Sequence, residues 1–76
     1  SVEPSYEFTV DVADEIGAIS TISVILAAKG ISIKNIGINN NRERGEGALK
    51  IAFYDESSME AAWNRLDKYK YEMFRM

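Results

Sequence analysis

The chain has 76 residues, a formal net charge of −3 and neither cysteine nor histidine. This length allows a single domain, and without cysteine or histidine it has neither disulfides nor the usual transition-metal sites, so no metal site is expected. Its 12 acidic residues against 9 basic ones disfavour nucleic acid, and no apolar run approaches the ~18 residues that would predict a membrane span.

A chain this short buries only about 60% of the surface that its unfolded form exposes. Because disulfides and metals are excluded, we expect a partner to supply the missing stability. The absence of a cysteine framework also fits a reducing, cytoplasmic location. Residues 1–5 begin without an initiator methionine and are expected to be a linker or tag remnant, which leaves one domain over residues 6–76.

Residues 6–12 alternate between apolar and polar side chains, which predicts a half-buried strand. From Gly17 to Lys29 apolar residues recur at helical spacing, so a helix is predicted there. Gly30 is predicted to end this helix in the left-handed conformation. A second strand begins at Ile31, and the parity shift between Ile33 and Ile36 predicts either a bulge near residues 34–35 or burial on both faces.

Residues 39–47 are polar and rich in asparagine and glycine, which predicts a hairpin connection to a third strand over residues 49–53. Ser57 and Glu60 fit a capping box at the start of a second helix, and residues 71–76 can form a fourth strand. The resulting β-α-β-β-α-β order predicts an α+β, ferredoxin-like sandwich. In this fold a four-stranded antiparallel sheet carries two helices on one face.

The first predicted helix has no charged residue between Glu15 and Lys29. Its outer face would consist of small and mostly apolar residues, namely Ser20, Thr21, Val24, Ala27 and Ala28. A solvated helix normally places charged residues on that face. One interpretation is a tolerated alanine-rich surface. The other, which we favour, is that this face packs against a second copy or another domain.

The turn between the first strand and the first helix is the main candidate for a ligand site. Gly17 allows close approach to the N–H groups at the start of the helix, and Asp14 and Glu15 place carboxylates beside them. Such a turn can hold the carboxylate and the ammonium group of a small zwitterion. The purely structural alternative, in which both acids only stabilise the helix dipole, is equally compatible with the sequence.

Asn35 is a polar residue among isoleucines, so its side chain either bonds to the hairpin backbone or reaches a ligand beside the strand. Elsewhere, no nucleophile has a base within reach, and there is no phosphate-binding glycine loop or twelve-residue calcium loop. The residues therefore indicate binding, and no catalysis is expected.

Four segments carry a resemblance to a known family: VDVADEIG at 10–17, LAAKGISI at 26–33, NIGI at 35–38 followed by Arg42-Glu43, and GALKIAF at 47–53. Over about residues 6–66 the chain resembles an ACT domain, a βαββαβ module that binds amino acids and regulates metabolic enzymes. The last two segments look more specifically like the C-terminal ACT domains of bacterial prephenate dehydrogenases.

This resemblance implies a non-catalytic feedback sensor without a cofactor of its own, joined in its parent chain to an NAD(P)-dependent dehydrogenase domain. The implied ligand is an amino acid, with tyrosine favoured, bound between the first loop of one copy and the second strand of another. The residues so implied are Asp14, Glu15, Ile16, Gly17, Ala18, Ser32, Ile33, Asn35 and Ile36. The implied homodimer pairs through the second strand and the first helix.

Two positions depart from many relatives, which have proline where this chain has Ile16 and asparagine where it has Ser32. An alternative is therefore a purely structural dimerisation domain that binds no small molecule. Other functions found on the same βαββαβ frame fit less well. A phosphate-binding hydrolase would need an arginine in the acidic first loop, and RNA binding would need exposed aromatic and basic residues on the sheet.

Overall fold

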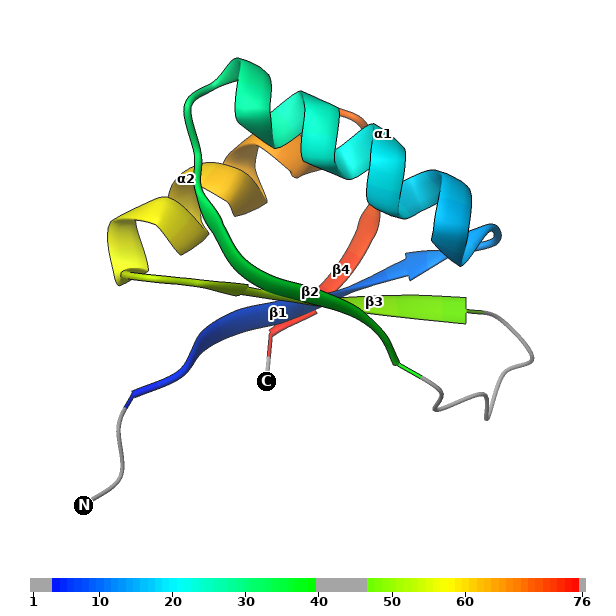
Figure 1. Ribbon diagram of the computed structural model, residues 1–76, viewed down its shortest axis with the longest axis horizontal. Helices are drawn as coiled ribbons and strands as arrows, with labels where there is room; N and C mark the ends of the chain where they lie inside the picture. Colours follow the sequence, from blue (N-terminus) through cyan, green and yellow to red (C-terminus); the bar gives the residue numbers. More distant parts are fainter. Residues whose placement is uncertain (1–3, 40–46, 76) are drawn as a thin grey trace.

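The structure is a computed structural model that describes residues 4–39 and 47–75. Its elements are β1 (Tyr6–Val12), α1 (Glu15–Ala28), β2 (Ile33–Asn39), β3 (Gly47–Phe53), α2 (Glu56–Asp67) and β4 (Glu72–Arg75). The strands form one antiparallel sheet in the order β2-β3-β1-β4, and both helices cover the same face of it (Figure 1). The predicted ferredoxin-like sandwich is confirmed. Among the described residues, neither helix is long and apolar enough to cross a membrane.

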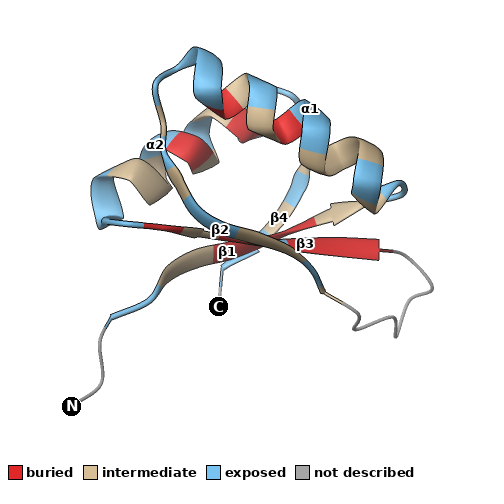
Figure 2. Cartoon of the chain, in the orientation of Figure 1, coloured by how far each residue is buried: buried red, intermediate tan, exposed pale blue. Residues whose placement is uncertain are grey.

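The core lies between the helices and the inner face of the sheet, as the buried positions in Figure 2 show. Alternation along β1 and β3 turns their large apolar residues toward the helices, and each helix adds two fully buried residues. The buried set is Phe8, Val10, Ile22, Leu26, Leu49, Ile51, Phe53, Ala62 and Leu66. The Phe8 ring lies 5.3 Å from the rings of both Phe53 and Trp63, so aromatic contacts join the sheet to α2.

β2 forms one edge of the sheet and contains the predicted bulge. Its register with β3 shifts between Ile33, which pairs with Phe53, and Asn35, which pairs with Ala52. The extra residue lets both Ile33 and Ile36 pack against the core although their positions differ in parity. The expectation of a bulge near residues 34–35 is confirmed.

Gly30 ends α1 as predicted, with a positive φ of 69°. The N–H of Gly30 donates to the carbonyl of Ala27 at 2.9 Å, and that of Ile31 donates to the carbonyl of Leu26 at 3.0 Å. This pair of bonds is the Schellman motif, which satisfies the last carbonyls of the helix and reverses the chain. As a result, β2 runs back beneath α1 in the opposite direction (Figure 1).

The predicted start of α2 is wrong. The helix begins at Glu56, and its N-cap is Asp55, whose side chain accepts a 2.8 Å hydrogen bond from the N–H of Ser58. The Ser57 hydroxyl also donates to Asp55, at 3.0 Å. These bonds, above all that from the Ser58 backbone, hold the pKa of Asp55 below its usual value. Ser57 and Glu60 therefore do not form a capping box.

Glu60 instead ties α2 to β4. Its carboxylate accepts two hydrogen bonds from the Arg75 guanidinium, one of them at 3.1 Å, and these bonds lower the pKa of Glu60. The same guanidinium lies 4.0 Å from the centre of the Trp63 ring. A bidentate ion pair and a cation–π contact thus fix the short last strand against the middle of α2.

Gly30→Ala should lower the free energy of unfolding by about 1 kcal/mol, because an alanine resists the left-handed conformation. For a domain of this size that corresponds to a fall in melting temperature of roughly 4–8 °C. Gly37→Ala is the matched control, because neither glycine has an atom near its missing Cβ and Gly37 has no positive φ. Thermal unfolding followed by circular dichroism measures both. Equal melting temperatures for the two variants would contradict the assigned role of Gly30.

Candidate functional site

Asp14 is the N-cap of α1, so the helix begins two residues earlier than predicted. Its backbone is extended, with φ −119° and ψ 97°, and its carboxylate accepts a 3.1 Å hydrogen bond from the N–H of Gly17. The N–H of Ala18 donates to the Asp14 carbonyl at 2.8 Å and opens the helical ladder. Two of the N–H groups that a ligand carboxylate would use are therefore already occupied by Asp14 itself.

Gly17 lies inside the first turn of α1, and a Cβ there would collide with the Asp14 carboxylate. With a larger residue at this position the Asp14 carboxylate would have to shift for the cap to form. Its neighbour Ile16 points outward and is 77% exposed, the most exposed of the large apolar side chains in the described residues. Among the described residues the N–H of Ile16 takes part neither in the cap nor in the helical ladder, so it is a donor that this turn can offer to a ligand.

The side chain of Glu15 points toward the sheet, in contrast to the outward-pointing Ile16. Its side chain lies over the backbone of Gly47, where any Cβ would collide with it. Gly47 is the first residue of β3, and the next residue, Ala48, pairs with Asn39 at the end of β2. The contact therefore fixes the N-terminal end of α1 above the hairpin end of β2.

The second group of predicted site residues lies at the opposite end of β2. Ser32 is exposed just before the strand, whereas Ile33 and Ile36 face the helices and pack against the core. Asn35 pairs with Ala52 and faces the uncovered side of the sheet. There it lines a shallow hollow of about 340 Å³ beside the ion pair of Lys50 with Glu7, whose charged atoms are 3.2 Å apart.

Within one chain the two groups of site residues are not brought together. α1 has 14 residues, which at 1.5 Å per residue is a length of about 21 Å. Because β2 runs antiparallel to α1, Ser32 and Ile33 lie near the C-terminal end of the helix and residues 14–18 at its N-terminal end. A pocket that uses both groups requires a second copy of the chain.

The ligand site at the first loop stays a prediction, and the different contacts that Asp14 and Glu15 make were not foreseen from the sequence. Asp14 caps the helix and Glu15 packs on Gly47, so neither extends freely into a ligand pocket. The spacing of Asp14 three residues before Gly17 is the signal that could have identified the cap. In the described part of the chain no group of three or more acidic residues is placed to hold a metal ion.

Comparison with known proteins relates the chain to prephenate dehydrogenases. No family model matches the chain. The chain is 41% identical over 70 residues to prephenate dehydrogenase of Bacillus subtilis, and the match covers 91% of the chain but 19% of that enzyme. Its fold superposes on the crystal structure of the ACT domain of prephenate dehydrogenase from Bacillus anthracis with a TM-score of 0.80 and 37% identity, covering 90% of this chain and 99% of that one.

The chain belongs to the ACT domains of prephenate dehydrogenase. The resemblance expected from residues 10–17, 26–33 and 47–53 is confirmed, and membership supports a regulatory rather than a catalytic role for this ACT domain. The ACT domain spans about a fifth of the length of the Bacillus subtilis enzyme. The expected linker at residues 1–5 stays a prediction. Residues 1–3 lie outside the described residues, as do Arg42 and Glu43, and Pro4 and Ser5 are exposed before β1.

A double-mutant cycle should show that the effect of replacing Gly17 on stability depends on the Asp14 cap in this ACT domain. Asp14→Ala should lower the free energy of unfolding by about 1 kcal/mol through loss of the cap. Gly17→Ala alone should also destabilise, because its Cβ displaces the Asp14 carboxylate. In the Asp14→Ala background the same change should instead stabilise by about 0.5–1 kcal/mol, since alanine is the better helix former. Urea unfolding measures all four proteins, and additive effects would contradict the assignment.

Proposed function

We propose that this ACT domain is the feedback-sensing part of a longer prephenate dehydrogenase, and that it binds an amino acid, with tyrosine favoured, between two copies. The catalytic domain would lie in the remainder of that longer protein. The observation that carries the proposal is the separation of the two groups of site residues within one chain. A pocket built from both groups can form only when a second chain supplies the missing half.

The geometry of β2 supports this arrangement. β2 bonds to β3 on one side, and along Ile33 to Ile38 its other side faces no further strand among the described residues. Antiparallel pairing of two such edges, centred near Ile36, would join two sheets into one of eight strands. It would set Ile33 of one copy opposite Asn39 of the partner subunit. Because Asn39 marks the end of β2 that lies beneath the start of α1, residues 14–18 of the partner would come close to Ser32 and Ile33.

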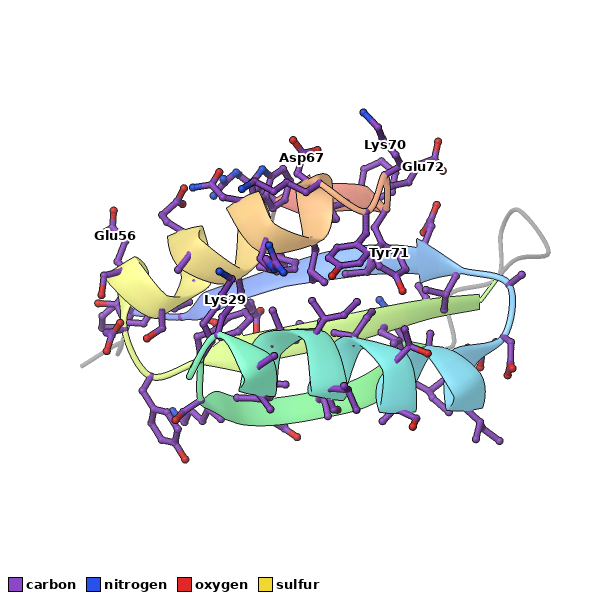
Figure 3. The ribbon with its side chains drawn as sticks, turned by 90° about the horizontal axis from the view of Figure 1, so that it is seen from above. Lys29, Glu56, Asp67, Lys70, Tyr71 and Glu72 are labelled. Atoms are coloured by element: carbon purple, nitrogen blue, oxygen red, sulfur yellow. The ribbon has the colours of Figure 1, made fainter. Side chains whose placement is uncertain are left out.

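The outer side of α1 supports the same contact. Figure 3 shows α1 lying along the β2 side of the sheet, so the helix and the strand edge form one side of the molecule. The predicted outer residues of α1 are all exposed, and Val24 is 67% exposed. With no charge between Glu15 and Lys29, two copies can bring these sides together without burying an unpaired charge.

At the proposed site the ligand carboxylate would take the N–H of Ile16, and the exposed Ser32 of the neighbouring copy supplies a hydroxyl for the ammonium group. The positive end of the α1 dipole favours the carboxylate at this position. Asn35 points to the opposite side of the sheet from Ile36, so the two cannot line one pocket unless the bulge rearranges.

A structural dimerisation domain without a ligand is the second candidate, and one observation favours it. The Gly17 N–H, which is the natural donor to a ligand carboxylate, already bonds to Asp14 at 3.1 Å. In that case the β2 edge and the α1 side would still pair, but no amino acid would change the stability of the dimer.

Tyrosine should raise the melting temperature of the purified domain saturably. A ligand at one hundred times its dissociation constant stabilises the folded form by about 2.7 kcal/mol, which for a domain of this size is roughly ten degrees or more. The test is thermal unfolding in the presence of tyrosine, phenylalanine, tryptophan or glycine. The oligomeric state is measured in parallel. A dimer whose melting temperature is indifferent to every amino acid would reject the sensor and support the structural candidate.

Val24→Lys should convert the proposed dimer into a monomer and weaken tyrosine binding at least tenfold, because it places a cation in the middle of an apolar contact. Phe74→Lys is the matched control. It also replaces an exposed large side chain with lysine, but it lies in β4, at the opposite edge of the sheet from β2. Sedimentation equilibrium gives the association constants. If Val24→Lys dimerises as well as Phe74→Lys, the α1 side is not the interface.

A further inference from the structure

A row of residues on α2 faces the C-terminal end of α1 across a groove. Ala61, Asn64, Arg65 and Lys68 follow one another at helical spacing, so they lie along one stripe of α2. Together with Lys29 and Ile31, which follow α1, they line a cavity of about 250 Å³. That is about the liquid volume of eight water molecules, enough for a small organic ligand.

The lining of this groove is basic in a protein that is acidic as a whole. Three cations, Lys29, Arg65 and Lys68, line it, and no carboxylate does. Among residues 4–39 and 47–75 none of the three forms an ion pair, whereas Lys50 and Arg75 do. Figure 3 shows Lys29 reaching from the end of α1 toward α2. Positive charge therefore converges on one cavity from two different helices, without a negative group of the described chain to balance it.

Arg65 carries a second, independent sign of a missing partner. Its Nε is buried and has no hydrogen-bond partner in the described part of the chain. A buried N–H without an acceptor is costly, and most such groups in folded proteins are satisfied. The guanidinium lies 5.5 Å from the centre of the Tyr69 ring, within the range of a cation–π contact. A water molecule does not reach Nε, so an oxyanion in the groove would bind the terminal nitrogens of the guanidinium and would reach Nε only after the side chain turned.

We propose that this groove is a binding site for a small organic anion that carries a carboxylate or phosphate group. Arg65 would hold the oxyanion through its terminal nitrogens, Lys29 and Lys68 would neutralise its charge, and Asn64 would bond a further polar atom. Ile31 and Ala61 give the groove an apolar floor for a short carbon chain. The groove lies next to the Ser32 half of the proposed amino-acid site, but none of the residues that line it belongs to that site.

Helix dipoles alone do not account for the cluster. Lys29 and Lys68 are the C-cap residues of their helices, where a cation offsets the partial negative charge of the last carbonyls. That effect amounts to about half a charge per helix, against three full positive charges at the groove. It explains why a lysine follows each helix. It does not explain why Lys29 shares a cavity with two cations of α2, or why Arg65 Nε is left without an acceptor.

The site is tested by titration with succinate and with inorganic phosphate, monitored through the NMR chemical shifts of the backbone amides. Sodium chloride keeps the ionic strength constant. We expect saturable chemical-shift changes at Ala61, Asn64 and Lys68 with at least one of the two anions. Comparing the dissociation constants of succinate and phosphate shows whether the site prefers a carboxylate or a phosphate. Arg65→Gln should weaken this binding at least tenfold, and Arg65→Lys should bind with intermediate affinity because it keeps the charge but loses the planar fork.

Lys70→Gln is the matched control, since it removes the same charge from an exposed lysine that does not line the groove and that extends away from α1 (Figure 3). Its affinity should stay within twofold of the parent. If Arg65→Gln fails to fold, the double variant Lys29→Gln/Lys68→Gln removes two exposed cations instead and should also bind at least tenfold more weakly. Shifts that follow ionic strength alone, equal affinities in the Arg65→Gln and Lys70→Gln variants, or no shift with either anion would each overturn the proposal.

Discussion

The reversal of the chain at Gly30 determines where the candidate site residues lie. Two hydrogen bonds and one left-handed glycine end α1 and send the chain directly back as β2. Antiparallel packing of α1 on β2 then places the start of the helix above the hairpin end of the strand. It also places Lys29 beside α2 at the other end. The split of the proposed amino-acid site and the existence of the basic groove both follow from this single turn.

Local patterns predicted the elements well because they report burial directly. Alternation in β1 and β3, the apolar stripe of α1 and the glycine at position 30 each depend on neighbours in sequence. The parity shift in β2 predicted either a bulge or burial on both faces, and the structure has the bulge, which lets Ile33 and Ile36 share one face. These features needed no knowledge of which strand pairs with which.

The helix starts were predicted too late for a physical reason. Both helices begin after an aspartate, Asp14 or Asp55, that lies close behind the last residue of a strand. Ser57 can cap a helix in the same way as Asp55, so the local sequence does not determine which of the two is the N-cap. The pairing of β3 in the sheet determines it. β3 keeps its register with β1 up to Phe53, and the chain must turn within the next two residues to bring α2 back over the core.

The site was less predictable than the fold because its parts meet through long-range packing. The face on which Asn35 lies depends on where the bulge falls, and a shift of one residue would reverse it. The contact of Glu15 with Gly47 joins segments more than thirty positions apart. The basic groove combines Lys29 with Arg65 of α2 and with Lys68 at the C-cap of that helix, both more than thirty positions further along the chain, and no local spacing marks such a cluster.

A ligand site divided between two copies has a thermodynamic consequence that a site within one chain lacks. An amino acid that contacts residues 14–18 of one copy and Ser32 of the other binds the dimer but not the monomer. By linkage, the ligand must then strengthen the dimer by the same factor by which dimerisation strengthens ligand binding. Domains this small generally have a low free energy of unfolding, so the stabilisation that a linked ligand adds is large in comparison. Any change in how two copies pack along β2 alters the distance between the half-sites, which is the physical basis on which a bound amino acid could act on a domain outside this chain.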